Sequence, residues 1–286
     1  VQWEDNWKGQ FLIQEINFKM LFIQPTFSYK LNEKFGIGLG LIYATGNYSL
    51  RKAIAIQDTT GNYGGANLKG NANGMGFNIG IYFKANEKLS IGIDYRSAVN
   101  AAIKSGTADF TVASSAANDY HNTTFSTNLN LPQVFSLGLG YVVNSKFKLA
   151  LDINYTGWEI HDSMIIDFSE NSKKLKDAHE ATMYENSFTF RIGGQYLLTK
   201  KWATRLGAYY DLSPVKNGYF TPETSDTDKL GITVGATYHV TKKVNIDISM
   251  IYIEGMKRTD TNINTQFGGS YKTKTVLPGI SLEYVF

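Results

Sequence analysis

Tyr29-Lys-Leu-Asn-Glu-Lys-Phe35 is a short polar turn between two stretches in which apolar and polar residues alternate. An aromatic residue stands three positions before the turn Asn, and Lys follows two positions after it. The same pattern, with Asn or Thr in the turn, recurs at 83–89, 141–147, 196–202 and 238–244. Asn and Thr favour short turns because their side chains bond to nearby backbone groups. We therefore predict five β-hairpins, repeated as one hairpin plus one long connection.

The composition limits the classes of protein that need to be considered. The chain has 286 residues, no Cys and a formal net charge of +3. It is long enough for one large β domain, it has no disulfide or thiolate metal site, and nothing in its charge suggests nucleic acid. The sequence has no run of 18 apolar residues, so it predicts no membrane-spanning helix. It begins with Val1 and shows no signal peptide, so we expect either that the signal peptide has been removed or that the N-terminus is cut off.

Alternate positions of the predicted strands separate two kinds of residue. Side chains alternate across a strand, so residues two apart share one face. One face is uncharged and apolar, and the other carries Gly, Ser, Thr, Asn and scattered charges. The apolar rows include Met75, Phe77, Ile79, Ile81 and Phe83; Leu137, Leu139 and Tyr141; Leu149, Leu151 and Ile153; and Ile192, Ile232 and Val234. The opposite rows include Asp94, Arg96, Lys148, Asp152, Arg191, Arg205, Asp211, Lys229, Asp247 and Glu283.

The position of the aromatic residues distinguishes a membrane barrel from a soluble sandwich. A sandwich would show the same alternation with its apolar face inward. In all five hairpins, however, the apolar face carries Tyr or Phe at the same distance from the turn (Tyr29, Phe83, Tyr141, Tyr196 and Tyr238). Such a belt at one height is typical of the aromatic girdle of a transmembrane β-barrel. The chain also ends on an aromatic residue, Phe286, within its last predicted strand.

The alternation predicts eleven strands in one domain, 1–286, without a linker. We expect them at about 17–31, 34–54, 72–85, 88–104, 130–143, 146–160, 186–198, 201–212, 228–240, 243–257 and 272–286. The short turns then lie on one side, and the long connections 55–71, 105–129, 161–185, 213–227 and 258–271 lie on the other. Short periplasmic turns with long outer loops are the pattern of Gram-negative outer-membrane barrels.

Eleven is an odd number, whereas single-chain bacterial barrels have an even number of strands. The first predicted strand also runs from the outside inward. We therefore expect an incomplete barrel that lacks at least one strand at its N-terminus, and whose first and last strands do not pair fully.

One connection differs from the others. Residues 169–183 lack strand alternation and are rich in Ser, Lys, Glu and Ala, which favours a short helix. Such a helix is either a solvated surface segment or a lid over a ligand entrance.

Several stretches together resemble the FadL/TodX family of outer-membrane transporters for long-chain fatty acids and other hydrophobic compounds. They are Asn73-Gly-Met-Gly-Phe-Asn-Ile-Gly-Ile-Tyr82 with Leu89-Ser-Ile-Gly-Ile-Asp-Tyr-Arg-Ser97, then Leu129-Asn-Leu-Pro-Gln133 and Tyr155-Thr-Gly-Trp158. Most specific is Tyr210-Asp-Leu-Ser-Pro-Val215 followed by Thr221-Pro-Glu-Thr-Ser-Asp226. The ending Gly279-Ile-Ser-Leu-Glu-Tyr-Val-Phe286 is typical of the family but shared by many barrels.

The resemblance implies a fourteen-stranded barrel with an N-terminal plug that carries an Asn-Pro-Ala motif. The sequence has neither the plug nor the motif, and three strands would be missing with them, including the kinked third strand. The resemblance further implies passive diffusion of hydrophobic compounds through an outer-membrane barrel, with outer-membrane lipids and lipopolysaccharide as neighbours. We expect a monomer, no cofactor and no enzymatic activity.

Uptake of a fatty acid needs an apolar groove and a cation for the carboxylate. Three arginines are predicted to face the lumen, Arg96, Arg191 and Arg205, with Lys104 and Lys229 nearer the outside. Each either binds ligand or pairs with an acid such as Asp94, Asp152, Asp211, Asp247 or Glu283, since buried charges are usually paired. Arg96 is the strongest ligand candidate because it lies in the family-like Asp94-Tyr-Arg-Ser97 segment.

Four outer aromatic residues, Tyr120, Phe125, Tyr184 and Phe220, either form an initial capture groove or pack within their loops. The four His (121, 161, 179 and 239) lack metal-ligand spacing. An outer-membrane lipase would need a Ser beside a His on the lipid face, and His239 falls on the lumen face. Gly36-Ile-Gly-Leu-Gly40 alternates inside a strand and is not a phosphate loop.

Two classes of function remain open. The first is a transporter of hydrophobic compounds. The second is a polar-solute porin, or a non-transporting barrel that partners a surface or secretion assembly. A plug with Asn-Pro-Ala would favour the first class, and an unplugged lumen the second.

Overall fold

The computed structural model describes residues 1–284 and leaves out 285–286, so the prediction for Phe286 lies outside the described residues. Strands and two short 3₁₀ helices, η1 (Ser114–Ala116) and η2 (Trp158–Ile160), make up the regular structure. None of the helices within 1–284 is long and apolar enough to cross a membrane. The described chain is thus nearly all β, as predicted.

The strands follow the chain in hairpins. The first half contains β1 (Glu15–Ile23), β2 (Thr26–Lys30), β3 (Phe35–Gln57), β4 (Tyr63–Lys84), β5 (Leu89–Arg96), β6 (Val99–Thr111), β7 (Thr123–Leu131), β8 (Val134–Val142) and β9 (Phe147–Thr156). The second half contains β10 (Ser163–Phe168), β11 (Ala178–Ala181), β12 (Ser187–Leu197), β13 (Trp202–Asp211), β14 (Lys229–His239), β15 (Val244–Gly255), β16 (Arg258–Thr261), β17 (Gly268–Tyr271) and β18 (Lys274–Tyr284).

All five predicted turns are present and share one set of hydrogen bonds. The Asn32 side-chain oxygen accepts the backbone N–H groups of Lys34 and Phe35, at 2.8 and 2.9 Å. Asn86, Asn144, Thr199 and Thr241 accept the corresponding pair in their own turns. The turn residue thereby satisfies backbone donors that no strand partner reaches, which explains the repeat of Asn or Thr.

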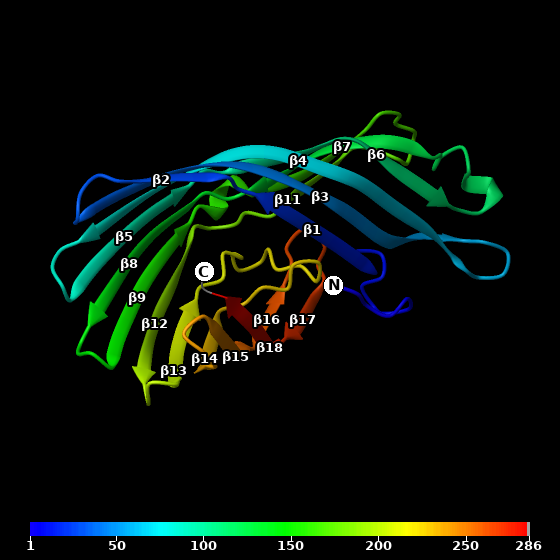
Figure 1. Ribbon diagram of the computed structural model, residues 1–286. Coiled ribbons are helices and arrows are strands. Elements are labelled where there is room, and N and C mark those ends of the chain that lie inside the picture. The colour runs from blue at the N-terminus through cyan, green and yellow to red at the C-terminus, as the bar shows by residue number, and fades with distance from the viewer. Residues whose placement is uncertain (285–286) are drawn as a thin grey trace.

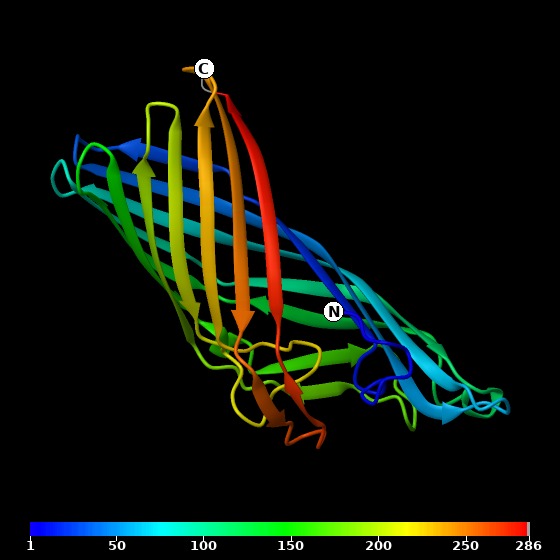
Figure 2. The same cartoon turned by 90° about the horizontal axis from the view of Figure 1, so that it is seen from below.

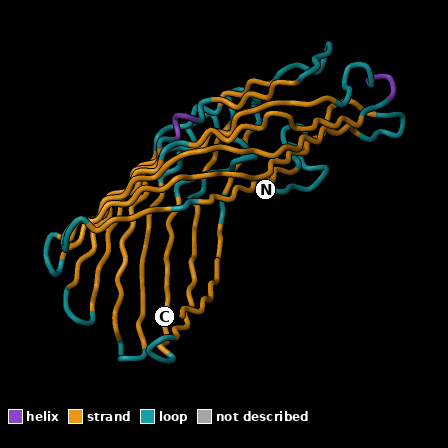
Figure 3. The backbone as a smooth tube through the Cα atoms, turned by 45° about the horizontal axis from the view of Figure 1, so that its top comes forward, coloured by secondary structure: helices purple, strands orange, loops and turns teal. Residues whose placement is uncertain are grey.

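Sixteen strands form one antiparallel sheet. Counting β1 with β2, β5 with β6 and β7 with β8 as single passes, and leaving out the edge pair β10 and β11, the sheet crosses eleven times. This is the predicted number. The sheet curves round an enclosed space, with the connection 213–227 and the β16–β17 hairpin on its concave side (Figures 1 and 2). The short turns lie along one rim, away from the longer connections (Figure 3).

The sheet is open. Among the described residues, β1 and β2 pair only with β3, and β18 pairs only with β15. The first and last strands therefore do not pair with each other, as the sequence predicts. Both free edges present backbone groups that lipid could not hydrogen-bond.

The convex face of the sheet around the short turns is apolar and exposed. Predicted lipid-facing residues Phe77, Ile79, Leu137, Leu151, Ile192 and Ile232 are all exposed, and none is packed in a core. Cross-strand register keeps them in rows, since Leu137 pairs with Ile153 and Leu151 pairs with Ile192. The charges predicted for the lumen lie at the alternate positions. The membrane orientation of this half is confirmed.

Aromatic belts border this apolar band at both ends. At the turn end, Phe35 stacks on Phe83 with ring centroids 4.5 Å apart, and Trp202 contacts Tyr238 at 4.8 Å. The other border includes Tyr43, Tyr155 with Phe188, and Tyr210. Phe35 and Tyr43 are eight positions apart on β3, as are the belt residues of β9 and β13. Eight positions span roughly 26 Å along the strand, which at a tilt of about 40° gives a height of roughly 20 Å, somewhat below the height of about 25 Å typical of the apolar band of outer-membrane barrels.

Beyond the second belt, β3, β4, β6 and β7 continue as long strands, where the sequence predicted loops at 55–71 and 105–129. β3 runs to Gln57, and only 58–62 separate it from β4. Here the outward face of the strands becomes polar and the concave face becomes apolar. On β3, Asn47 and Ser49 point outward, while Ile42, Ala44 and Tyr48 are buried on the concave side. The expected apolar outward row is absent, which is why these strands were missed.

These extended strands enclose the main buried core. It contains Tyr48, Leu68, Ala72, Ile103, Phe125, Leu129, Phe168 and Leu175. Phe125 is 1 % exposed, and its ring lies where a Cβ on Gly106 would come within 2.3 Å. A larger residue at 106 would displace the ring, so Gly106 permits the close approach of strand and aromatic.

The predicted helix in 169–183 is wrong. Ala178–Ala181 form β11, which pairs with β10 through Ile165 and His179. Leu175 is buried in the main core, and Ser172 Oγ accepts the backbone N–H groups of Lys174 and Leu175. Strand pairing and burial thus outweigh the weak helix preference of the segment.

Candidate functional site

Glycine lines much of the concave face between the aromatic belts. Gly36, Gly38 and Gly40 alternate on β3, and Gly38 lies opposite Gly80 on β4. Further along the same height, Gly92 lies opposite Gly138. Because glycine has no side chain, the wall is thin here and the enclosed space is wide, as predicted for 36–40.

Two of the three predicted lumen arginines are paired with acids. Arg191 donates to Asp152 at 2.8 Å, across the register between β12 and β9. Arg205 donates to Asp247 at 3.2 Å and to Thr237 at 2.7 Å. Both arginines therefore serve in cross-strand pairs, which was the structural alternative in the sequence.

The two lysines predicted near the outer end behave differently. Lys229 lies between Asp211 and Asp226 and forms an ion pair with each. Lys104 is exposed on the face opposite Ile103, so it points away from the enclosed space. Its grouping with the lumen cations was wrong because the break at Ser97 and Ala98 shifts the alternation by one residue, so that Val99, Ala101 and Ile103 face inward on β6 and Lys104 faces outward.

A line of strand breaks crosses the sheet where the thin-walled part meets the buried core. β1 and β2 part at Gln24 and Pro25, β5 and β6 at Ser97 and Ala98, and β7 and β8 at Pro132 and Gln133. Backbone hydrogen bonds connect the break residues to the neighbouring strands: the Pro25 carbonyl accepts the Leu41 N–H at 3.1 Å, and the Ser97 N–H donates to the Phe77 carbonyl at 2.9 Å. We call this line the crease. Pro supplies no backbone donor, which ends the ladder at two of the breaks.

Arg96 lies on the concave face directly beside the crease. Its guanidinium carbon is 5.7 Å from the centre of the Phe22 ring, a cation–π contact. Asp94, its expected partner, accepts the Asn78 amide instead, at 2.6 Å. Within residues 1–284, no carboxylate lies within ion-pair distance of Arg96. Of the three predicted arginines, Arg96 is the one whose guanidinium forms no ion pair with an acid among the described residues.

An apolar surface begins next to this cation. The concave side of β1 carries Phe18, Met20 and Phe22, opposite Tyr48, Gly46 and Ala44 of β3. Phe18 and Phe22 keep 42 % and 40 % of their surface exposed, toward the enclosed space. Ile42, Ala44 and Val99 form a buried cluster beside them, against which Met20 packs. A cation beside exposed aromatic rings suits a ligand with one anionic end and an apolar body.

The four outer aromatic residues predicted for ligand capture lie at different places. Phe125 belongs to β7 and is buried in the main core, so its assignment to a loop was wrong. Tyr120 is half-buried against Phe110, with ring centroids 6.0 Å apart. Tyr184 and Phe220 are buried together with Val215. Packing was the alternative reading of these residues, and ligand binding by them stays a prediction.

A buried carboxyl that the sequence reading did not single out lies in the connection 213–227. Glu223 Oε2 and the Tyr48 hydroxyl are shielded from solvent and have no hydrogen-bond partner among the described residues. Burial raises the pKa of the Glu223 carboxyl, and nearby Glu180 raises it further, while Thr221 and Lys52 act in the opposite direction. Its place in the family-like Thr221-Pro-Glu-Thr-Ser-Asp226 segment was the one available signal.

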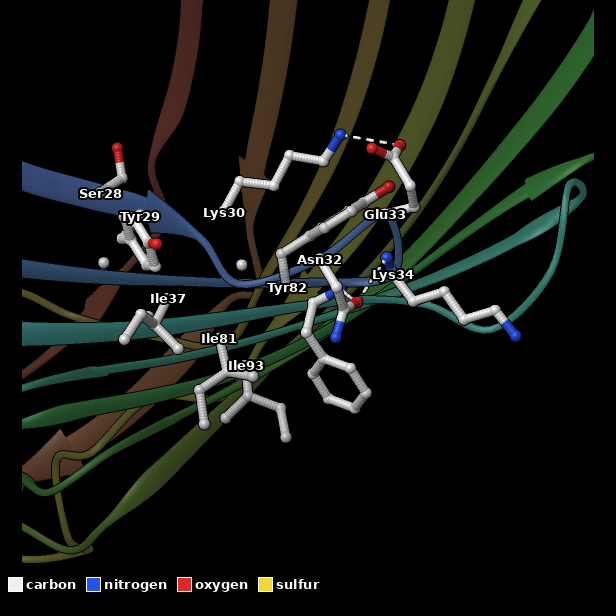
Figure 4. A pocket seen from close by; sticks show the side chains of 14 residues that line it. Ser28, Tyr29, Lys30, Asn32, Glu33, Lys34, Ile37, Ile81, Tyr82 and Ile93 are labelled. Atoms are coloured by element: carbon white, nitrogen blue, oxygen red, sulfur yellow. Dashed lines mark hydrogen bonds and ion pairs between the residues drawn. The ribbon is translucent and has the colours of Figure 1, made fainter.

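The hollow around the first turn does not mark a second site. It has a volume of about 510 Å³, and Lys30 and Glu33 form an exposed ion pair there at 2.8 Å. Figure 4 shows Ile37, Ile81 and Ile93 side by side on one side of the sheet, with Tyr82 and Lys30 on the other. This hollow therefore wraps the lipid-facing edge of the sheet and encloses no converging polar groups.

The described residues contain no group of three His, Asp or Glu side chains that could hold a metal ion. His239 lies on the concave side, as predicted, and contacts Asn245 at 2.7 Å.

Comparison with known proteins adds to this geometry. A family model described as "Outer membrane protein transport protein (OMPP1/FadL/TodX)" matches residues 1–286. Outer membrane protein P1 of Haemophilus influenzae is 27 % identical over 229 residues, which cover 74 % of this chain and 47 % of that protein. The long-chain fatty acid transport protein of Salmonella typhi is 24 % identical over 283 residues, 91 % of this chain and 64 % of that protein. The chain spans about half the length of most curated relatives it matches.

Solved structures share the fold. A Pseudomonas aeruginosa FadL homologue superposes with a TM-score of 0.86 at 19 % identity, covering 99 % of this chain and 71 % of that one. The CymD monoaromatic hydrocarbon channel gives 0.72 at 18 % identity, covering 95 % and 74 %. At these identities the likeness concerns the fold alone. Together with the belts and the exposed apolar band, it identifies the sheet as the wall of an outer-membrane barrel.

Proposed function

Because the chain belongs to the OMPP1/FadL/TodX family of outer membrane transport proteins, we propose that it forms most of a barrel through which long-chain fatty acids enter by passive diffusion. The relatives include long-chain fatty acid transport proteins and a monoaromatic hydrocarbon channel, so the family match alone does not choose between charged and neutral substrates. The choice rests on the site beside the crease.

The observation that supports a fatty acid is the free cation of Arg96. Its charge is half-buried and unpaired, whereas Arg191 and Arg205 each have an acid. A neutral hydrocarbon would gain little from such a group, since a shielded charge without a partner is unfavourable. A carboxylate would accept charge-assisted hydrogen bonds from it, typically worth about 1.5–3 kcal/mol.

The apolar surface supplies the place for the tail. Phe22 contacts the guanidinium on one side, and Phe18 and Met20 continue the same row of β1 away from the crease. A carboxylate on Arg96 would direct its acyl chain along these rings toward the buried core. The thin, glycine-lined wall on the other side of the crease offers the onward path. Arg191 and Arg205, and the aromatic residues Tyr120, Phe125, Tyr184 and Phe220, remain predicted contacts of secondary weight.

The open edges bear on the complete protein. Backbone groups of β18 and of β1 with β2 could not face lipid unpaired. We propose that further strands join these edges in the intact barrel, as the resemblance to a fourteen-stranded family with a plug implies. We also propose that the barrel is a monomer in contact with outer-membrane lipids and lipopolysaccharide.

The test uses uptake by cells that produce the full-length protein. We expect Arg96→Ala to lower uptake of a radiolabelled long-chain fatty acid by about tenfold, the equivalent of roughly 1.4 kcal/mol. Uptake of a neutral hydrocarbon of similar length should change little, because it has no carboxylate. Arg191→Ala serves for comparison: it removes an arginine paired with Asp152, so as a secondary contact it should lower fatty-acid uptake less than Arg96→Ala does.

The outcomes separate the alternatives. Equal loss of both substrates in Arg96→Ala, with weaker heat-modifiable migration on gels, would show that Arg96 is structural. Unchanged fatty-acid uptake by well-folded Arg96→Ala would remove this residue from the site. Selective passage of polar solutes by the unaltered protein would favour a porin.

A further inference from the structure

The outward face of the extended strands carries cations without acidic partners. Lys19 on β1, Lys69 on β4 and Lys104 on β6 are exposed on the convex side, beyond the belt residue Tyr43. Within residues 1–284, no ion pair or hydrogen bond engages any of the three side chains. Lysines at a comparable height on the far side of the sheet differ, because Lys272 and Lys274 both contact Glu254, at 2.8 and 3.9 Å.

Asparagines fill the positions between these lysines. Lys19 lies opposite Asn47, and Asn47 lies opposite Asn71, so the three form one row across β1, β3 and β4. Asn73 and Asn128 lie on either side of Ala102 in the neighbouring row, and Asn100 lies on the same face of β6. Adjacent strands are about 4.8 Å apart, which puts amide donors within reach of each neighbour. We call these lysines and asparagines the outward polar band.

The position of the band decides what can cover it. It begins four positions beyond Tyr43 on β3, roughly 13 Å along the strand, on the same face as the lipid-exposed residues Leu39 and Leu41. Lipid headgroups are therefore the first layer that it meets in an outer membrane. Two acids lie at the margins of the band. Asp109 lies on β6, two positions beyond Thr107, which is the partner of Lys69. Asp167 lies on β10, opposite Ser126 of β7, and β7 separates it from Lys104 on β6.

We propose that the outward polar band binds the phosphate-bearing headgroup of lipopolysaccharide in the outer leaflet. The lysines pair with headgroup phosphates, and the asparagine amides donate to phosphate and sugar oxygens. The proposal depends on the outer-membrane location of the chain and is independent of fatty-acid transport. It identifies the part of the protein surface that contacts lipopolysaccharide, the lipid partner that the family resemblance implies.

The experiment compares two triple variants of the full-length protein in detergent. Lys19→Gln, Lys69→Gln and Lys104→Gln together remove the cations of the band. Lys34→Gln, Lys88→Gln and Lys146→Gln together remove the same charge from the opposite rim, at exposed turn positions. Heat-modifiable migration confirms that both variants fold, and lipopolysaccharide retained per protein is measured by mass spectrometry. Thermal unfolding is then followed with added lipopolysaccharide, intact or dephosphorylated.

We expect the band variant to bind intact lipopolysaccharide about a hundredfold more weakly, since each cation near an anionic surface contributes about a factor of five. The rim variant and the unaltered protein should retain it equally. Dephosphorylated lipopolysaccharide should shift the unfolding temperature of the unaltered protein and of the rim variant much less than intact lipopolysaccharide does, because only the asparagine contacts with sugar oxygens remain. Equal retention by the two triple variants, or an undiminished shift with dephosphorylated lipopolysaccharide, would overturn the proposal. Fatty-acid uptake by the band variant should stay normal, which separates this test from the one at Arg96.

Discussion

Two stretches of β3 show opposite chemistry on the same two faces. From Phe35 to Tyr43 the outward residues are aromatic or aliphatic, and the inward ones are mainly glycine. From Asn47 to Arg51 the outward residues are polar, and the inward residues Tyr48 and Leu50 pack on the core. No register shift separates the two stretches. What changes is the surroundings, because the hydrocarbon of the bilayer covers the first stretch, and headgroups and water cover the second. A β-barrel strand therefore has no fixed apolar side; each side matches what it faces at that height.

The largest effect is expected in the core of the extended strands. Phe125→Ala removes a fully buried ring that packs on Gly106, which should lower the free energy of unfolding of this half by about 3–5 kcal/mol. Hydrogen exchange should increase in β6 and β7 while the hairpin turns keep their protection. Loss of protection throughout the sheet would show that the two regions unfold as one unit.

A charge on the outward face should distinguish lipid from water. Leu151 lies midway between Phe147 and Tyr155, so Leu151→Arg should cost about 2–4 kcal/mol in urea unfolding from a bilayer. Asn47→Arg lies on the outward face beyond the belt, and we expect a change within about 0.5 kcal/mol. Equal costs for the two substitutions would place both positions in the same medium.

The smallest effect concerns pH and the connection 213–227. The raised pKa of Glu223 means that the folded state keeps the proton to a higher pH than the unfolded state, whose ordinary value is 4.5. Its contribution to stability therefore falls as pH rises above about 4.5 and through the raised folded value. Glu180 and Lys52 face the same carboxyl and modulate it. Protection factors of the amides in 213–227, which correct for the base-catalysed rise in intrinsic exchange, should therefore be lower at pH 8 than at pH 4.

Glu223→Gln provides the control, because glutamine keeps the shape and cannot ionise. In this variant the protection factors of 213–227 at pH 8 should match those at pH 4. An unchanged pH dependence in Glu223→Gln would assign the effect to another group.

How well the sequence predicted each region depends on the same contrast. The sequence predicted the five turns, the eleven passes and the lipid-facing rows correctly, because apolar and polar residues alternate with a period of two and each face carries one type of residue. It did not predict the extended strands, because Gly70, Ala72 and Asn73 offer small and polar residues on both faces. The loop boundaries and the helix in 169–183 were wrong because the core that orders these segments comes from strands distant in sequence. The inward placement of Lys104 was wrong because the break at Ser97 and Ala98 shifts the alternation by one residue.

The candidate site was predicted in part. Arg96 was chosen from its place in a family-like segment and its expected face. Its lack of an acidic partner was not predictable, because Asn78 on another strand occupies Asp94. Likewise, the contact of Arg96 with Phe22 arises only where β1 and β5 meet across the concave side. Residue type and spacing identify which charges face inward, but three-dimensional pairing decides which one remains available to a ligand.

A scan of single cysteines along β3 tests the exchange of faces most directly, since the chain contains no Cys of its own. Leu39→Cys, Leu41→Cys, Asn47→Cys and Ser49→Cys place a thiol on the outward face of the full-length protein in intact cells. A membrane-impermeant maleimide should label positions 47 and 49 and spare 39 and 41, which should react only with a lipid-soluble reagent. Labelling of all four from water, or protection of all four by lipid, would contradict the exchange of faces at Tyr43.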